Sequence, residues 1–279
     1  MEILKIEGLC KKCPEFSLKN VTFSMESGTV MGFIGRNGAG KTTTLKSMLR
    51  LVHPDAGHVE ICGMDVAEQE LAVKAQIGFV TGSAAYYPRK RLGQLTAATR
   101  RFYPNWDEAR YQDCLRRFAL DEGKRVSELS EGMKVKYQLA LAMSHHAKLL
   151  ILDEPTSGLD PAARDDLLGL FLELVERDGA SVLFSTHITS DLDACADTIT
   201  YIRNGEIFAS EARRAFTERY RYLRADEAAV SPELAAKLIA PRRHQGEIEG
   251  LLRTADAPEA GSPATLEQIM VHLEREVEA

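Results

Sequence analysis

The sequence is short of paired cysteines and of basic charge. Its five cysteines are odd in number and scattered, which argues against a disulfide framework. Cys10 and Cys13 could supply half of a zinc site, but no second pair completes four ligands, so free thiols are the favoured interpretation. Lysine and arginine number 35 against 41 acidic residues, a net charge of −6. This balance gives no electrostatic footprint for nucleic acid, and we expect no nucleic-acid partner.

Long apolar runs are also missing. No window approaches the roughly eighteen apolar residues of a membrane span, and residues 1–12 have no apolar core of the kind found in signal peptides. We therefore expect a cytoplasmic protein that acts at a membrane only through a partner. A length of 279 residues with 44% hydrophobic residues suits one large α/β domain with an appendage, or two domains.

A glycine-rich loop stands between an apolar strand pattern at 29–34 and a helical pattern at 41–51. Its glycines allow successive backbone N–H groups to face phosphate oxygens, and the helix N-terminus adds partial positive charge. Lys41 can reach the β- and γ-phosphates, and the Thr42 hydroxyl can hold Mg²⁺. A turn without a ligand would explain neither residue. The predicted nucleotide-binding residues are Asn37, Gly38, Ala39, Gly40, Lys41, Thr42 and Thr43.

A second chemical pattern follows the apolar run at 149–152, which ends in Asp153 and Glu154. Such a strand places both carboxylates at the carboxyl edge of a sheet, where open α/β folds bind ligands. Beside Mg²⁺ and a triphosphate, Asp153 can hold a metal-bound water and Glu154 can act as general base. His187 follows the apolar run at 181–185 and can hydrogen-bond a γ-phosphate, although a lone histidine is ordinarily structural.

The remaining pattern divides the chain at about residue 210. Up to that point strands and helices alternate, with a helical region at about 89–146, and the last feature is a hairpin whose Asn204-Gly205 turn is typical of type I′. Ser130 is a suitable N-cap for a helix within the helical region. Strands are predicted at 3–8, 21–25, 29–34, 58–62, 77–80, 148–152, 180–185, 198–202 and 207–209, and a further helix at 161–177.

Residues 211–279 are charged and alanine-rich, and they predict a small accessory domain with no catalytic cluster. A proline- and glycine-containing linker is expected at 257–263. An amphipathic helix is expected at 265–278, with Thr265 and Gln268 as a capping box. Its apolar face would consist of Leu266, Ile269, Met270 and Leu273.

Taken together, these motifs resemble those of the ATP-binding cassette (ABC) family of ATPases over residues 1–210. Residues 35–42 match the Walker A loop, 149–154 Walker B, 157–160 the D-loop and His187 the switch histidine, while 129–133 look like a variant of the signature Leu-Ser-Gly-Gly-Gln. The resemblance implies an α/β P-loop NTPase fold of ABC type, with a RecA-like core, an antiparallel β subdomain and an α-helical insert. It implies ATP and Mg²⁺ as ligands.

In this family two such domains pair head to tail around ATP. The resemblance implies that Ser130 and Gly132 bind the γ-phosphate of the nucleotide held by the other chain, and that Asp160 belongs to the D-loop. A helix N-terminus aimed at phosphate is what helix physics favours. The expected assembly is a homodimer, or a dimer with a related ATPase chain.

The sequence is similar to ATPase subunits of bacterial antibiotic-efflux exporters of the bacitracin type in three segments, namely residues 31–46, the Ser-Glu-Gly-Met variant and residues 150–161. This narrower resemblance implies an exporter with a separate integral membrane subunit, which the insert at 89–146 would face from the inner side of the cell membrane. The alternative is a soluble ABC ATPase with a regulatory or translation-linked role. Such relatives usually carry two cassettes or a long coiled-coil insert, and this chain has neither.

Two positions depart from the family pattern. The family glutamine expected after the strand at 77–80 is replaced by Gly82, which implies slow basal hydrolysis or altered coupling unless Ser83, Gln76 or a water substitutes. The adenine-stacking aromatic aligns best with Cys13. Phe16 is nearby and is the candidate for stacking, with a plain core phenylalanine as the alternative.

Overall fold

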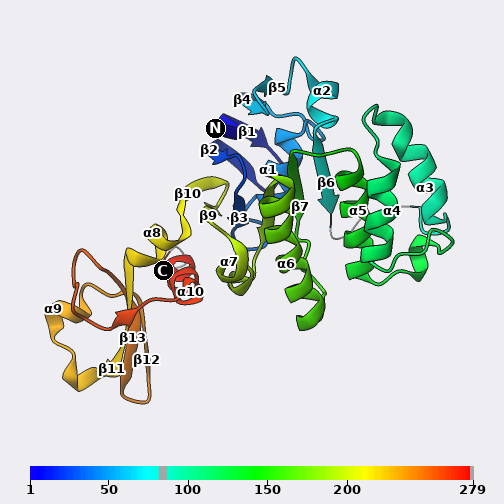
Figure 1. Ribbon diagram of the computed structural model, residues 1–279. Helices are drawn as coiled ribbons and strands as arrows, with labels where there is room; N and C mark the ends of the chain where they lie inside the picture. The colour runs from blue at the N-terminus through cyan, green and yellow to red at the C-terminus, as the bar shows by residue number, and fades with distance from the viewer. Residues whose placement is uncertain (82–86, 277–279) are drawn as a thin grey trace. The chain divides into compact units, whose positions relative to one another are not determined.

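The computed structural model describes residues 1–81 and 87–276. The chain separates into two compact units, Met1–Ser210 and Glu211–Ala279 (Figure 1). Within the described residues, no helix combines the length and the apolar character needed to cross a membrane. All five cysteines are free thiols.

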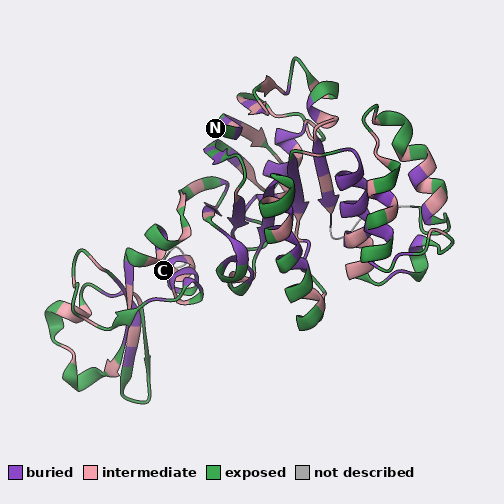
Figure 2. Ribbon diagram, in the orientation of Figure 1, coloured by how far each residue is buried: buried purple, intermediate pink, exposed green. Residues whose placement is uncertain are grey.

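The first unit is built on a six-stranded sheet in the order β10-β9-β3-β8-β7-β6. From β6 to β9 the neighbouring strands are parallel. The central strands β3, β7 and β8 are almost wholly buried (Figure 2), as expected of apolar strands covered on both faces. The strands are β3 (Val30–Ile34), β6 (Ile77–Thr81), β7 (Leu149–Asp153), β8 (Ser181–Thr186), β9 (Thr198–Arg203) and β10 (Glu206–Ala212).

Helices cover this sheet, and their ends follow local chemistry. The helix α1 (Lys41–Met48) contacts β7, while α6 (Pro161–Asp178) and α7 (Thr189–Cys195) contact β3. The predicted extension of α1 to residue 51 is wrong, because Arg50 takes a left-handed conformation with φ of 55° that a helix does not continue through. The α6 prediction is confirmed, since it begins at Pro161 and ends at the left-handed Gly179.

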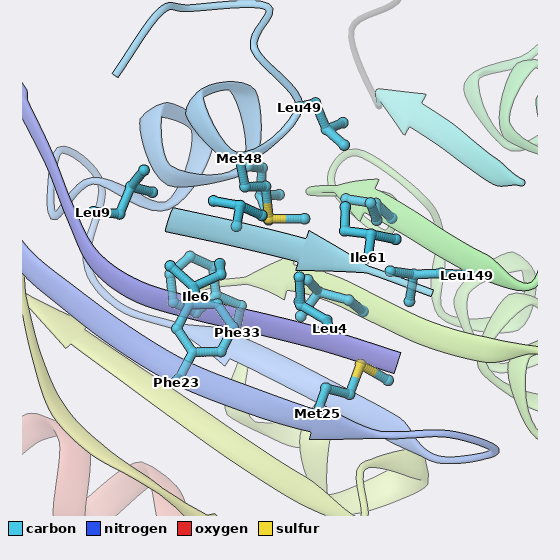
Figure 3. Close-up of a cluster of buried hydrophobic side chains, with 14 of the residues drawn as sticks. Leu4, Ile6, Leu9, Phe23, Met25, Phe33, Met48, Leu49, Ile61 and Leu149 are labelled. Atoms are coloured by element: carbon cyan, nitrogen blue, oxygen red, sulfur yellow. The ribbon is translucent and has the colours of Figure 1, made fainter. Parts of the chain in front are cut away.

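A second, antiparallel sheet packs on the first in the order β2-β1-β4-β5. Its strands are β1 (Glu2–Lys12), β2 (Ser17–Glu26), β4 (Ala56–Ile61) and β5 (Met64–Asp65), and the short helix α2 (Glu70–Lys74) follows. Figure 3 shows Leu4 and Ile6 of β1 beside Phe23 of β2 and Phe33 of β3, with the two phenylalanine ring centroids 5.5 Å apart. Each such buried side chain contributes about 1.5–3 kcal/mol. The two sheets thus share one core.

The predicted helical region is confirmed. It contains α3 (Leu92–Thr99), η1 (Arg100–Phe102), α4 (Glu108–Arg117), η2 (Val126–Glu128) and α5 (Glu131–Ser144). The buried Thr96 hydroxyl lies 2.7 Å from the Tyr111 hydroxyl and 2.9 Å from that of Tyr137, so one polar cluster joins α3, α4 and α5. The buried side chains of α4 and α5 include Tyr111, Leu115, Val135, Leu139 and Met143, and Phe118 directly after α4 is buried as well.

The second unit is a small sheet with one long helix. The sheet order is β12-β13-β11-β14, and α10 contacts β12 and β13. The predicted capping box is confirmed, since the Thr265 amide donates to Gln268 Oε1 at 2.9 Å and the Gln268 amide donates to Thr265 Oγ1 at 3.2 Å. The elements are α8 (Arg213–Glu218), β11 (Tyr220–Asp226), η3 (Glu227–Ala229), α9 (Pro232–Ala235), β12 (Ile239–His244), β13 (Glu247–Arg253), β14 (Ser262–Pro263) and α10 (Leu266–Glu276).

The expected linker at 257–263 is wrong. Its last two residues form β14, which pairs with β11. Arg221 donates to the carbonyl oxygens of Ala260 at 2.7 Å and Gly261 at 2.8 Å, and Ala257 packs on the core of the unit. The composition suggested a flexible segment, but its carbonyl groups find partners in a neighbouring strand.

Candidate active site

The loop at 35–40 joins β3 to α1, and its glycines have steric reasons to be there. Gly40 adopts a φ of +113°, and a Cβ atom added to it would lie 2.6 Å from Phe16 Cζ. A Cβ atom on Gly35 would lie 2.5 Å from the Ile202 carbonyl oxygen. Any larger residue at either position would force the loop away from the strand that supports it.

The β9–β10 hairpin braces this loop from behind. Asn204 and Gly205 have φ values of 50° and 80°, in keeping with the predicted turn. The Gly205 amide donates to the Ala39 carbonyl at 3.1 Å, and the Lys19 amide donates to the Gly205 carbonyl at 2.8 Å. The sequence predicted the hairpin but did not indicate that its turn would hold the glycine-rich loop against β2.

Lys41 is buried, with 5% of its side chain exposed, and its ammonium group has three oxygen neighbours. Nζ donates to the carbonyls of Gly35 at 2.7 Å and Arg36 at 3.3 Å, and lies 3.1 Å from Glu154 Oε1. A buried ammonium is tolerated only when it is paired in this way. The loop therefore holds one positive charge at a defined point beside the acid pair.

A cavity of about 310 Å³ opens over the loop, at the lower end of the range for ligand pockets. It brings together most of the predicted nucleotide-binding residues. Ala39 is the exception, because its side chain packs in the hydrophobic core. The cavity is lined by Phe16, Arg36, Asn37, Gly38, Gly40, Lys41, Thr42, Thr43 and Glu154.

Asp153 and Thr42, the two residues predicted to act at Mg²⁺, are in contact at the edge of the sheet. The Thr42 hydroxyl donates to Asp153 Oδ2 at 2.8 Å, and the Ser185 hydroxyl donates to Asp153 Oδ1 at 2.7 Å. The Ser185 oxygen also accepts a hydrogen bond from the Glu154 amide at 2.9 Å. Sequence reasoning missed Ser185, because its role depends on β7 and β8 being neighbours in a register that pairs it with Asp153.

Glu154 is held at both carboxylate oxygens. Oε1 faces Lys41, and Oε2 lies 2.8 Å from His187 Nδ1. Glu154 also has a positive φ of 50°, a conformation that costs a non-glycine residue about 1–3 kcal/mol and persists only where its surroundings fix it. The carboxylate thus sits between a cation and an imidazole at the wall of the cavity.

The signature and D-loop residues have local roles as helix caps. Ser130 caps α5 by accepting from the Met133 amide at 3.2 Å, and Asp160 caps α6 by accepting from the Ala162 and Ala163 amides at 3.1 and 3.0 Å. Of the residues that the structure describes, those lining the cavity do not include Ser130 or Gly132. Their predicted action in trans stays a prediction.

Gln138 is a further residue that the sequence did not single out. Its buried amide accepts from the Thr81 backbone N–H at 3.1 Å and donates to the Thr81 carbonyl at 3.2 Å, so it joins the signature helix α5 to the end of β6. A polar residue on the buried face of a helix was the available signal. Gly82 and Ser83 lie outside the described residues, so the expectation for Gly82 is untested.

The chain is similar to known proteins of one family. The family model described as ABC transporter matches residues 18–157. A Nod factor export ATP-binding protein I from Burkholderia lata is 34% identical over 206 residues, covering 72% of this chain and 67% of that protein. The bacitracin transport ATP-binding protein BcrA from Enterococcus faecalis is 27% identical over 261 residues, covering 91% of this chain and 84% of that protein.

The matched span covers 65% of the ABC transporter ATP-binding protein YtrB and 85% of the ABC transporter ATP-binding protein NatA, both from Bacillus subtilis. A solved structure described as the ATP binding subunit of an ABC transporter superposes with a TM-score of 0.68 at 30% identity, covering 77% of this chain and 93% of that chain. The P-loop fold of ABC type and the ATPase activity expected from the motifs are thereby confirmed. The loop and Glu154 line one cavity, Asp153 contacts Thr42, and His187 contacts Glu154. With these matches, the chain belongs to the ABC transporter family as an ATP-binding ATPase subunit.

Proposed function

We propose that this chain hydrolyses ATP to power export through a separate integral membrane subunit, at the inner face of the cell membrane. The observation that carries the proposal is the cluster of Lys41, Glu154 and His187 beside the Thr42–Asp153 pair. Export is supported by the likeness to a protein whose name gives Nod factor export, and transport in general by the likeness to a protein whose name gives bacitracin transport.

The nucleotide site follows from the cavity lining. On binding ATP, Lys41 would exchange the loop carbonyls and Glu154 for phosphate oxygens, which are stronger partners for an ammonium group. The loop amides of residues 37–43 would hold the phosphates at the N-terminus of α1. Phe16 lines the same cavity and is suited to stack on the adenine base.

The Thr42 hydroxyl and Asp153 carboxylate fit Mg²⁺, because they are adjacent oxygen ligands of the type that this ion prefers. Bound there, Mg²⁺ would neutralise charge on the phosphates. Ser185 orients the Asp153 carboxylate through one hydrogen bond. Its second hydrogen bond, from the Glu154 amide, fixes the backbone between Asp153 and Glu154.

Glu154 would accept the proton of the attacking water once Lys41 turns to phosphate. His187 Nδ1 contacts Glu154 Oε2, and an imidazolium at this position would donate from Nδ1 to Glu154 and from Nε2 to a γ-phosphate oxygen. A positioned general base contributes on the order of 10²–10⁴-fold in rate. In this proposal Glu154 accepts the proton and His187 contacts the phosphate.

The proposed active form is a head-to-tail homodimer. Ser130 is exposed at the N-terminus of α5, so a second chain could bring it and Gly132 to the γ-phosphate, with Asp160 at the same interface. The helical insert at 89–146 would then face the membrane subunit. The unit at 211–279 would act as an accessory domain of this subunit.

Purification from native membranes tests the complex. The expected result is that the chain brings down a polytopic membrane protein and that the isolated complex hydrolyses ATP. Recovery of an active ATPase with no membrane protein, in ribosomal or soluble fractions, would contradict the exporter assignment and favour the soluble alternative.

A further inference from the structure

A buried carboxylate lies directly behind the catalytic pair. Asp191, in the first turn of α7, has no exposed surface. Its Oδ2 accepts hydrogen bonds from two hydroxyl groups, that of Thr156 at 2.6 Å and that of Thr186 at 3.3 Å. Both threonines are also fully buried. One oxygen atom therefore joins two segments of the chain.

These two segments carry the residues proposed to act on ATP. Thr156 comes two residues after Glu154, and Thr186 immediately precedes His187. The Thr186 oxygen also accepts from the Ile188 amide at 2.9 Å, which fixes the backbone on the far side of the histidine. The separation of the two segments determines whether His187 can reach Glu154, a contact of 2.8 Å.

Stability alone does not account for an acid at this position. Asp191 Oδ1 accepts no hydrogen bond within the described chain and lies 3.8 Å from Arg164 Nε, which likewise has no hydrogen-bond partner there. A buried carboxylate oxygen without a hydrogen bond is unfavourable, and apolar residues of similar volume often stabilise a protein more than such a pair. The acid is explained if its geometry, rather than its contribution to stability, is what matters.

We propose that Asp191 is a positioning residue for ATP hydrolysis. It holds the segment that follows Glu154 and the segment that carries His187 at the spacing that places Glu154 against His187. The proposal rests on the roles given to those two residues under the proposed function. A misplacement of about 1 Å in a catalytic group can cost on the order of 10²-fold in rate, whereas the phosphate loop, held from other elements, would keep its affinity for nucleotide.

The test compares kcat with nucleotide affinity in the full chain. Asp191→Asn keeps the shape of the side chain but replaces one acceptor oxygen with a donor. Thr156→Val removes the hydroxyl group at nearly constant volume, and Thr156→Ser restores it. Asp193→Asn, an exposed acid on the same helix, is the matched control. Wild type and Glu154→Gln are assayed in parallel.

We expect Asp191→Asn and Thr156→Val each to lower kcat about tenfold or more, with the dissociation constant for ATP within about twofold of wild type. Thr156→Ser and Asp193→Asn should keep kcat near wild type. The kcat of the double variant should fall little below that of the single variants, because both substitutions break the same contact.

Wild-type kcat in both Asp191→Asn and Thr156→Val, with turnover lost in Glu154→Gln, would overturn the positioning role while leaving the proposed function intact. An equal loss in Thr156→Ser and Thr156→Val would also overturn it, since packing rather than the hydroxyl would then be responsible. If Asp191→Asn does not fold, the serine and valine pair still decides. Turnover retained in Glu154→Gln would instead remove the proposed function and the positioning role together.

Discussion

The two units each contain a cavity lined by charged side chains, and the cavities differ in how those charges are held. In the first unit the cavity of about 310 Å³ contains Lys41, 5% exposed and fixed by the loop and Glu154. In the second unit a cavity of about 230 Å³ is lined by Arg224, Arg242, Arg243, His244, Glu247 and Glu249.

The arginines of the second cavity are already paired on the surface. Arg224 contacts Glu247 at 2.6 Å and Arg242 contacts Glu249 at 3.3 Å, with more than half of each arginine side chain exposed. Solvent screens such pairs, and they contribute little to stability. Charge density alone therefore does not identify a site. Burial, backbone amides and convergence on one point distinguish the first cavity from the second.

The largest expected effect tests whether the first cavity is catalytic. Glu154→Gln keeps the shape of the side chain and removes the base, so kcat should fall by about 10²–10⁴-fold while ATP binding persists. Steady-state phosphate release and equilibrium binding of ATP measure the two quantities. As a control from the other cavity, Glu247→Gln should leave kcat unchanged. Turnover near wild type in Glu154→Gln would contradict the assignment of the base.

The same variant tests whether the site is completed by a second chain. With ATP bound and hydrolysis blocked, contacts made only in the closed dimer accumulate, so the mass of Glu154→Gln should double on adding Mg-ATP. Light scattering with and without nucleotide measures this. A monomeric mass at saturating ATP would show either that the head-to-tail arrangement is wrong or that the partner is a different ATPase chain.

Sequence reasoning succeeded where chemistry is local. The glycine-rich loop, the acid pair and the capped helices are read from neighbouring residues, and the strands that carry them are continuous apolar runs. Ser185, Gln138 and Asp191 were missed because their roles arise from strand order and helix packing between segments distant in the chain. No short pattern records that β8 lies between β3 and β7.

The strands of the second unit were missed for a different reason. The strands β12 and β13 place Arg242, Arg243, His244, Glu247 and Glu249 outward, so their composition resembles a solvated segment. Their connecting turn is Gln245-Gly246, with φ values of 53° and 85°, rather than the more diagnostic Asn-Gly. A weak turn signal between charged residues hid a hairpin.

A third prediction concerns acid stability of the first unit. His145 is 5% exposed and its ring stacks on Tyr103 with centroids 3.8 Å apart, and burial lowers the pKa of His145 to about 4. The unfolded chain, with a value near 6.5, binds the proton first as pH falls. Stability from this residue is therefore complete above about pH 6.5 and is lost progressively toward pH 4, by about 3 kcal/mol.

Denaturant unfolding followed by the fluorescence of Trp106, the only tryptophan and a neighbour of Tyr111, reports on the first unit. His145→Phe preserves stacking and removes the titration, so its stability should change less with pH between 6.5 and 4 than that of wild type. Parallel profiles for the two proteins would show that His145 is not the source. Burial also lowers the pKa of His272 in the second unit, which should give that unit a loss of the same sign.

The smallest effect concerns two arginines of β11, Arg221 and Arg224, that contact different kinds of group. Arg221 donates to two backbone carbonyls, of Ala260 and Gly261, whereas Arg224 pairs with an exposed carboxylate. Lysine keeps the charge but lacks the planar fork, so Arg221→Lys should weaken the hold on residues 260–261 by about 1–2 kcal/mol. Arg224→Lys should produce no measurable change, because a screened surface pair tolerates the exchange.

Hydrogen exchange of peptides from 257–263, measured in the full chain, distinguishes these outcomes. Faster exchange in Arg221→Lys alone would establish that backbone contacts, rather than charge, order the segment that composition marks as a linker. Equal exchange in both variants would mean that the β11–β14 pairing suffices without the arginine.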